Sequence, residues 1–299
     1  MKLLVTGANG LLGQKLCALL AGDEAIHLIA TARHQLNFDL PNVKFEALDV
    51  TVEDSIKKVF SATKPDVVIH TAAMTQVDQC ESEREACWLN NVTAVEYLAK
   101  TCEANNIHLI HVSTDFIFDG THGPLDEEAI PNPLSYYGES KLAAEKVVMK
   151  SKSPWAILRT VLVYGVTKDM SRSNIVLWVK KSLEEGKSIN VVNDQWRTPT
   201  LAEDLAMGCY LAAKNKARGV YNISGDEMMT PHDIAIATAT FFKLDKSLIK
   251  TADSGNFKQP AKRPAKTGFI IRKAEKELGY HPHSFVEGLA VVASQLKTL

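Results

Sequence analysis

The sequence has almost no net charge. Its 34 lysines and arginines balance 35 aspartates and glutamates, which gives a formal net charge of −1. A chain without a surplus of positive charge has no extended field to attract nucleic acid or an anionic membrane. We therefore expect neither as a partner, and any anionic ligand must be held by a local group of residues.

Long apolar runs and paired cysteines are also missing. No apolar run approaches the length that crosses a membrane, and the glycine-rich loop reached within six residues leaves no room for a signal peptide. No C-x-x-C pair occurs, and His281 and His283 lack further residues at the spacing of metal ligands. The number and spacing of the cysteines and histidines predict a cytoplasmic protein with no disulfide framework and no metal site. We expect its five cysteines to be reduced thiols: Cys17, Cys80, Cys87, Cys102 and Cys209.

The first third has the pattern of a dinucleotide-binding fold. A short apolar run over residues 3–6 is typical of a buried parallel strand, and it leads through Gly7, Gly10 and Gly13 into an amphipathic helix over 14–20. Three glycines in a turn can be structural alone, and their spacing differs by one residue from the usual fingerprint. The strand before them and the helix after them favour a pyrophosphate site at the helix N-terminus.

Residues at the ends of the next two predicted strands are candidates for cofactor contacts. Arg33 ends a strand over 25–32, where a basic residue suits the 2′-phosphate of NADP and an acidic one suits NAD. Alternatively, Arg33 is an ordinary surface arginine that contacts no cofactor. Asp49 and Val50 follow a strand over 43–48, and the Asp49 carboxylate could accept from an adenine amino group or cap the helix that begins near residue 51.

A fourth buried strand over 67–70 is followed by small residues that let a cofactor lie close to the main chain, from Thr71 to Thr75. The next helix carries Asn90 and Asn91, and an asparagine inside a helix is usually solvated. A fifth strand over 107–112 then runs into Ser113 and Thr114.

Tyr137 and Lys141 stand four residues apart in the stretch that begins at Ser135. If Pro133 and Ser135 open a helix, both side chains project from one face. A nearby ammonium stabilises a phenolate and would lower the tyrosine pKa toward the working range. Most Tyr-x-x-x-Lys pairs are solvated helix residues, so this pair gains its weight from the pattern that precedes it.

The segment from Ser113 to Gly120, the Tyr137–Lys141 pair, residues 193–200 and the Arg263-Pro264 pair together resemble the extended short-chain dehydrogenase/reductase family, and within it the dTDP-4-dehydrorhamnose reductases. The likeness covers nearly the whole chain. It implies an α/β fold in which a Rossmann-type doubly wound parallel sheet carries a smaller interleaved C-terminal substrate domain. We expect residues 1–168 and 200–224 in the first part, and 169–199 and 225–299 in the second.

The resemblance also implies roles for individual residues. Thr114, Tyr137 and Lys141 would form the catalytic set. The cofactor would contact Gly7, Asn9, Gly10, Leu11, Leu12, Gly13, Arg33, Asp49, Val50, Thr71, Ala72, Ala73, Thr75, Asn91, Val112, Ser113, Tyr137 and Lys141. The substrate would contact Asp115, Phe116, Trp196, Arg197, Thr200 and Arg263.

Three departures bear on the substrate. Phe116 stands where the family has Tyr, Trp196-Arg197 replaces small residues or glycine, and the residues after Arg263-Pro264 differ from the family pattern. A local basic cluster of Lys258, Lys262, Arg263 and Lys266 could meet a substrate diphosphate, although scattered surface cations are the rule.

We expect NADPH-dependent reduction, with NADH as a possible cofactor, of the 4-keto group of dTDP-4-dehydro-L-rhamnose or of a related keto sugar nucleotide. Some relatives form homodimers, sometimes with a metal ion at the contact, and the sequence leaves the oligomeric state of this chain open. Sugar-nucleotide dehydratases of the wider family place a second acid directly after this aspartate. Here Phe116 follows Asp115, so the chain lacks the acid that a dehydration needs. A 4-epimerase would retain tightly bound NAD, and Arg33 argues against that cofactor. A second interpretation places the chain in a different functional class, as a non-catalytic NADP-binding regulator. Residues 197–200 resemble those of methionine adenosyltransferase beta subunits, which are regulators of this kind.

Overall fold

The computed structural model describes residues 1–40, 43–168, 174–256 and 259–298. Its centre is a seven-stranded sheet in the order β10-β6-β5-β4-β1-β2-β3, and every pairing in it is parallel. The predicted doubly wound α/β fold is therefore confirmed. The strands are β1 (Lys2–Thr6), β2 (His27–Ala32), β3 (Lys44–Ala47), β4 (Val67–His70), β5 (His108–Thr114), β6 (Trp155–Thr160) and β10 (Gly219–Asn222).

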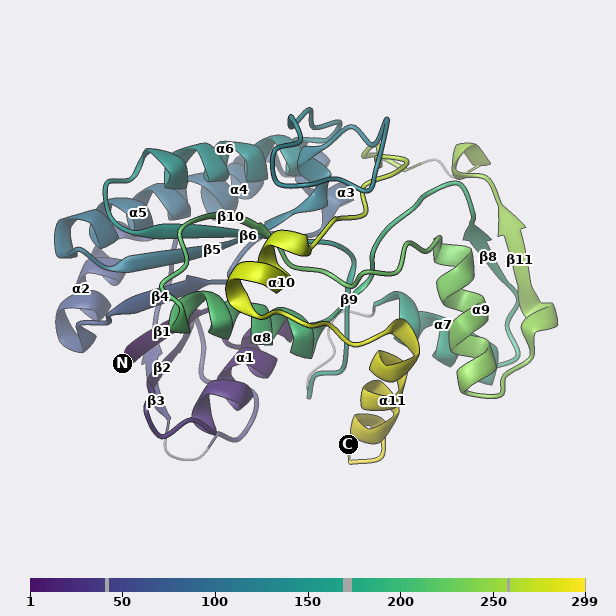
Figure 1. Cartoon of the computed structure of the whole chain (residues 1–299), viewed down its shortest axis with the longest axis horizontal. Helices are drawn as coiled ribbons and strands as arrows, with labels where there is room; N and C mark the ends of the chain where they lie inside the picture. The colour runs from purple at the N-terminus through teal and green to yellow at the C-terminus, as the bar shows by residue number, and fades with distance from the viewer. Residues whose placement is uncertain (41–42, 169–173, 257–258, 299) are drawn as a thin grey trace.

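Helices cover both faces of this sheet (Figure 1). α1 (Leu11–Ala21) and α8 (Ala202–Lys214) pack together on one face, and α2 (Glu53–Thr63), α5 (Ala94–Asn105) and α6 (Tyr136–Lys150) cover the other. Alternate residues of a strand point to opposite faces, so Leu3 and Val5 belong to one apolar cluster and Leu4 to the other. Burial on both faces explains why these strands read as continuous apolar runs.

A smaller group of elements lies beyond the carboxyl end of the sheet, at the right of Figure 1. It contains α7 (Ile175–Glu184), α9 (Pro231–Phe241), α11 (Phe285–Leu296) and a parallel pair formed by β8 (Ile189–Val192) and β11 (Ile249–Ala252). The chain returns from this group through α8 and β10, which pairs with β6. The remaining helical elements are α3 (Val77–Ser82), α4 (Arg84–Trp88), α10 (Arg272–Leu278) and short helical turns at Leu89–Thr93 (η1), Asp115–Ile117 (η2), Lys246–Leu248 (η3) and Ser254–Asn256 (η4).

Local sequence signals place the helix starts. The Ser135 side chain accepts a hydrogen bond from the Gly138 amide at 3.2 Å and caps α6, as expected. Thr230 and Asp233 form a reciprocal capping box at α9, with proline at the first helical position.

The chain leaves the sheet at the end of β6. The run over 156–165 divides into β6 and a short β7 (Val163–Tyr164), which pairs instead with β9 (Thr200–Leu201). Leu162 has a φ of 39°, and this left-handed conformation turns the chain out of the sheet. The break sends the polypeptide from the sheet toward the smaller group of elements.

Within the described residues no helix is both long enough and apolar enough to cross a membrane. All five cysteines are buried free thiols.

Candidate active site

Tyr137, Lys141 and Thr114 meet at the carboxyl end of β5. Tyr137 and Lys141 are buried on α6, and Thr114 is the last residue of β5. The Lys141 ammonium donates to the carbonyl oxygen of Val112 at 2.8 Å, and the Thr114 hydroxyl interacts with Tyr137. The structure thus brings the expected catalytic set together where ligands of parallel α/β sheets bind.

Burial controls the charge of these groups. It lowers the pKa of Lys141 to about 8, while the Glu145 carboxylate acts in the opposite direction. Burial raises the pKa of Tyr137 above its usual range, and the nearby Asp115 carboxylate adds to this rise. The expected lowering of the Tyr137 pKa is therefore wrong for this structure, because desolvation of a phenolate outweighs the hydrogen bond with Thr114, which acts to lower the pKa. The phenol keeps its proton at neutral pH.

The glycines of the first loop occupy positions where a side chain would collide. Gly7 has a φ of 71°, and a Cβ there would lie 2.9 Å from the amide nitrogen of Ala72. A Cβ on Gly13 would lie 2.2 Å from the carbonyl oxygen of Gly7. In the part of the chain that the structure describes, no side chain caps the amino end of α1, so its N–H groups face the loop. These features fit the diphosphate of a dinucleotide.

Asn9 connects this loop to the residues after β2. Its side chain donates to the carbonyl oxygen of Gln35 at 2.9 Å and accepts from the amide of Asn37 at 3.2 Å. Asn9 therefore orders the chain beyond Arg33. Leu11 and Leu12 lie half-buried in the first turn of α1.

Arg33 is exposed at the end of β2. Burial acts to raise the pKa of Asp49, but the hydrogen bonds from Thr51 and, after them, the positive charge of Arg33 lower it below its usual range. The Asp49 carboxylate accepts from the amide and the hydroxyl of Thr51 at 2.9 and 2.6 Å. Of its two expected roles, the helix cap is wrong, because α2 begins at Glu53 after an uncapped Val52. The neighbouring Val50 is buried. The adenine contact of Asp49 stays a prediction.

Asn91 holds the loop after β4. Its Oδ1 accepts from the Met74 amide at 2.8 Å, and its Nδ2 donates to the Met74 carbonyl oxygen and to the Ser140 hydroxyl, both at 3.0 Å. Asn90 and Asn91 both lie in the π-helical turn η1, but the Asn90 side chain bonds back to the Ala86 carbonyl oxygen of the preceding helix α4. Asn91 is thus the inward-facing asparagine, and it fixes the main chain next to Ala72, Ala73 and Thr75.

Two histidines behind Lys141 were missed by the sequence reasoning. His111 Nε2 lies 3.2 Å from Lys141 Nζ, and the His111 ring stacks on His70 with centroids 5.5 Å apart. His70 Nδ1 lies 2.7 Å from the Thr6 hydroxyl, which also accepts from the Thr71 amide. Both histidines lie in strands that are otherwise largely apolar, and nothing in the local sequence indicates which residue each of them contacts. Ser113, on the same strand end, is buried beside them.

Two of the expected substrate residues, Asp115 and Arg197, contact each other. Arg197 Nε lies 3.5 Å from Asp115 Oδ2, and both side chains are buried. The Arg197 guanidinium also donates to the carbonyl oxygens of Pro264 at 2.6 Å and of Trp196 at 2.7 Å. Thr267 donates to the same Asp115 oxygen at 2.5 Å. This network ties the residues after Arg263-Pro264 to the end of β5.

The other expected substrate residues are dispersed. Phe116 packs edge-on against the Tyr137 ring, with centroids 5.7 Å apart. The Trp196 side chain is 39% exposed. Thr200 is fully buried and donates to the Val161 carbonyl oxygen at 2.7 Å.

Arg263 pairs with Asp78 of α3, and their shortest contact is 2.7 Å. Within the basic cluster, Lys262 is exposed and Lys266 is half-buried, while Lys258 lies outside the described residues. His283 Nδ1 contacts Asp204 at 2.6 Å.

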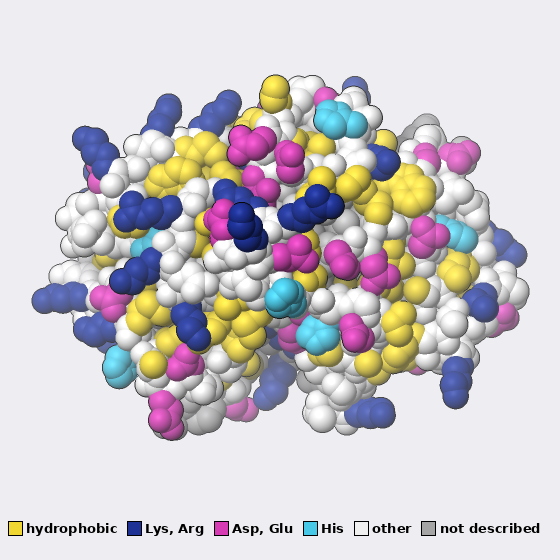
Figure 2. Space-filling view, viewed as in Figure 1, with side chains coloured by type: hydrophobic (Ala, Val, Ile, Leu, Met, Phe, Trp, Pro, Cys, Tyr) yellow, Lys and Arg dark blue, Asp and Glu magenta, His cyan; other side chains and the backbone are white. Residues whose placement is uncertain are grey.

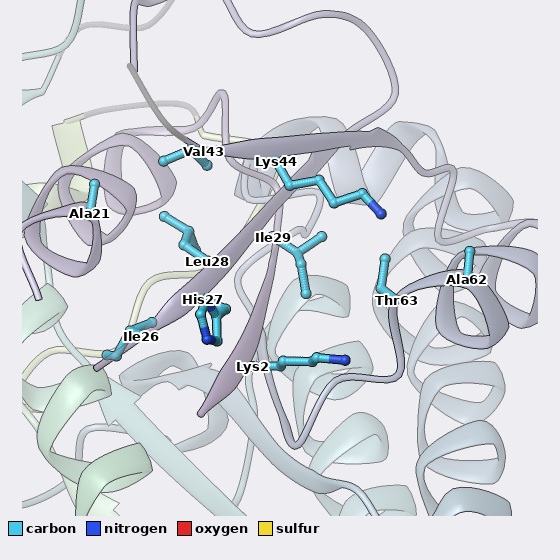
Figure 3. A pocket seen from close by; sticks show the side chains of 10 residues that line it. All are labelled: Lys2, Ala21, Ile26, His27, Leu28, Ile29, Val43, Lys44, Ala62 and Thr63. Carbon is cyan, nitrogen blue, oxygen red and sulfur yellow. The ribbon is translucent and has the colours of Figure 1, made fainter. Parts of the chain in front are cut away.

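The surface is consistent with the balanced charge of the sequence, since Figure 2 shows positive and negative side chains interspersed on the viewed face. A hollow of about 390 Å³ opens at the amino ends of β1 and β2, lined by residues that include Lys2, His27 and Lys44 (Figure 3). It lies at the opposite ends of these strands from Tyr137, so it is not part of the candidate site.

Comparison with known proteins identifies a family that matches nearly the whole chain. The family model described as "RmlD substrate binding domain" matches residues 1–298. The chain is 34% identical over 252 residues to "Methionine adenosyltransferase 2 subunit beta" of Xenopus laevis, a match that covers 83% of this chain and 74% of that protein. It is 32% identical over 292 residues to the "Probable low-salt glycan biosynthesis reductase Agl14" of Haloferax volcanii, and 96% of each chain is covered.

Solved structures of similar proteins have the same fold as this chain. A dTDP-4-dehydrorhamnose reductase from Clostridium acetobutylicum superposes with a TM-score of 0.88 at 29% identity, covering 99% of this chain and all of that chain. A dTDP-4-dehydrorhamnose reductase from Bacillus anthracis, solved in complex with NADP, has the same fold, with a TM-score of 0.84 at 24% identity over 98% of this chain and 99% of that chain.

Proposed function

The chain belongs to the RmlD substrate binding domain family, and from this premise we propose that it reduces the 4-keto group of a sugar nucleotide with NADPH. Members of the family named as reductases support an oxidoreductase. The observation that carries the proposal is the meeting of Tyr137, Thr114 and Lys141 at the carboxyl end of the sheet.

Each residue has a distinct task in this reaction. The buried phenol of Tyr137 retains its proton and gives it to the oxygen of the ketone as that oxygen becomes an alkoxide. The Thr114 hydroxyl donates a hydrogen bond to the same oxygen and fixes its direction. The Lys141 ammonium supplies positive charge that stabilises the phenolate left after proton transfer.

The nicotinamide cofactor supplies the hydride when it is bound. Gly7, Gly10 and Gly13 would hold its diphosphate at the open amino end of α1. Arg33 would pair with the 2′-phosphate, which favours NADPH over NADH, and the B. anthracis relative solved with NADP supports this preference. NADH would serve as a weaker hydride donor.

We propose dTDP-4-dehydro-L-rhamnose, or a closely related keto sugar nucleotide, as the substrate. The printed names of the C. acetobutylicum and B. anthracis structures support this class. Since Asp115, Arg197 and Thr200 bond to the protein itself, Phe116 and Trp196 are the better placed of the expected substrate residues. We propose that their rings border the sugar and the base.

A second candidate is a regulatory NADP-binding subunit, because the X. laevis relative is a subunit of methionine adenosyltransferase. A regulator could bind the cofactor without turnover. The intact set of Thr114, Tyr137 and Lys141 favours the enzyme, since a regulator has no need of a proton donor beside a buried ammonium.

One assay separates the two. Purified protein is mixed with NADPH and dTDP-4-dehydro-L-rhamnose, and absorbance at the nicotinamide band is followed with Tyr137→Phe protein as the control. Steady NADPH consumption that depends on Tyr137 supports the reductase. NADPH binding without consumption, across a panel of keto sugar nucleotides, would replace the reductase by the regulatory function.

A further inference from the structure

His111 makes a direct contact with Lys141 from behind the candidate site. Its Nε2 lies 3.2 Å from Lys141 Nζ, and both residues are at least 97% buried, with exposures of 1% and 3%. The other close acceptor of the ammonium is the Val112 carbonyl oxygen at 2.8 Å. Val112 is the residue after His111, so one short piece of β5 supplies both acceptors.

The direction of this hydrogen bond follows from the donor. An ammonium has three N–H groups and no lone pair, so Nε2 of His111 must accept. The ring is then neutral and carries its proton on Nδ1. In that tautomer His111 offers Lys141 a lone pair without adding a positive charge beside it.

His111 stays neutral over the whole working range. Burial lowers its pKa well below 6.5, and the positive charge of Lys141 acts in the same direction. His70 behaves alike, since burial lowers its pKa to about 3. A histidine that never gains a proton is a steady acceptor at every pH at which Lys141 titrates.

The ring is held by its surroundings. His111 stacks on His70 at 5.5 Å with the two planes 23° apart, and His70 is fixed by the Thr6 hydroxyl at the end of β1. Thr6 in turn accepts from the amides of Thr71 and Ala72, next to the cofactor loop. The orientation of His111 therefore depends on the strands that carry the nucleotide site.

We propose that His111 is a positioning residue for Lys141: its Nε2 lone pair and the Val112 carbonyl oxygen together hold the ammonium in its charged form and fixed orientation. This inference rests on the proposed function only for its effect on turnover. The hydrogen bond itself can be measured without substrate.

Several other groups face Lys141 and must be kept constant in the test. On α6 this is Glu145, which is paired with Arg159 of β6, and both of these side chains are buried. Cys80 of α3 and Cys87 of α4 contact each other near Tyr137, Asp115 of η2 lies beside Tyr137, and His70 of β4 lies behind His111. The variants below leave all of these unchanged.

The test follows the Lys141 side chain by NMR in protein labelled with ¹³C at the lysine Cε. The resonance that disappears in Lys141→Arg belongs to Lys141, and in the parent it should titrate near pH 8. Loss of a hydrogen bond to a charged group should lower this midpoint by about 1 to 2 pH units in His111→Leu. His111→Gln keeps an acceptor and should titrate close to the parent.

His108→Leu is the matched control, because His108 is a buried histidine on the same strand without contact to Lys141. It should leave the midpoint unchanged. Equal midpoints in His111→Leu and the parent, or an equal fall in His108→Leu, would overturn the proposal.

A measurement on the parent alone covers the case in which His111→Leu does not fold. Long-range ¹H–¹⁵N spectra distinguish the histidine tautomers, and His111 must be neutral with its proton on Nδ1. A proton on Nε2 would overturn the proposal whatever the variants do. If turnover is absent but the titration shifts as expected, the reductase fails while the role of His111 stands.

Discussion

Arg197 Nε lies 3.5 Å from Asp115 Oδ2, and the pair is enclosed by protein on all sides, with exposures of 5% and 2%. Two buried charges of opposite sign depend on each other, because neither can recover its hydration. Thr267 and the carbonyl oxygens around Arg197 complete the network. The pair therefore joins β5 to the chain near residue 265 and shapes the wall beside Thr114.

This pairing predicts a large loss of stability when one partner is removed. Arg197→Met and Asp115→Asn should each lower the free energy of unfolding by about 3–5 kcal/mol, since each leaves an uncompensated buried group. The double variant should lose less than the sum. Urea unfolding measures all four proteins, and the exposed pair Glu53–Lys57 serves as a control, because solvent screens its charges and its removal should change the stability little. Additive losses at Arg197 and Asp115 would argue against coupling.

Replacement of the proton donor should abolish most turnover. Tyr137→Phe removes the phenolic hydroxyl and should lower kcat by about 10²- to 10⁴-fold. NADPH affinity, followed by fluorescence titration, should change little. Tyr136→Phe is the control, because this neighbouring tyrosine packs against Arg84 and Trp88 away from the set. Near-normal turnover in Tyr137→Phe would remove this residue from the mechanism.

The cofactor preference should depend on Arg33. Arg33→Ala removes the charge that would pair with the 2′-phosphate, so KM for NADPH should rise about tenfold or more while KM for NADH stays near its native value. Lys44→Ala, which removes an exposed cation at the start of the neighbouring strand β3, should affect neither. Equal changes for both cofactors would make Arg33 an ordinary surface residue.

Turnover should fall at alkaline pH. The ammonium form of Lys141 is needed to stabilise the Tyr137 phenolate, and this form is present below its pKa of about 8 and lost above it. The rise in the Tyr137 pKa keeps the phenol protonated through the same range. A profile of kcat against pH should therefore show a descending limb near pH 8, and a flat profile to pH 9.5 would contradict the assigned role of Lys141.

Asn91 and Asn90 offer a matched comparison. Asn91→Ala leaves the amide and carbonyl of Met74 without their partner and should cost about 1–3 kcal/mol, with weaker NADPH binding because the loop after β4 loosens. Asn90→Ala removes one local bond to the Ala86 carbonyl oxygen one turn earlier and should cost less than about 0.5 kcal/mol. Thermal unfolding measures the stability of both variants, and titration measures their NADPH affinity. Similar losses in the two variants would contradict the role of Asn91 in holding the loop after β4.

Much of this molecule follows from local patterns. Apolar runs of four to seven residues separated by helical periodicity predict a parallel sheet, because each strand must be buried on both faces. The glycine positions, the Ser135 cap and the capping box at Thr230 depend on a few neighbouring residues, so local sequence is enough to place them. The four-residue spacing of Tyr137 and Lys141 fixes their common face for the same reason.

Tertiary structure decided what these residues touch. Only the packing of β5 against α6 sets His111 beside Lys141, and only the return of the chain near residue 267 brings the Thr267 hydroxyl to Asp115. The direction of the Tyr137 pKa shift also depends on burial, which raises the pKa more than the Thr114 hydrogen bond lowers it. Spacing along the chain determines faces and turns, whereas partners and desolvation arise between segments far apart in sequence, and for that reason they could be read only from the folded chain.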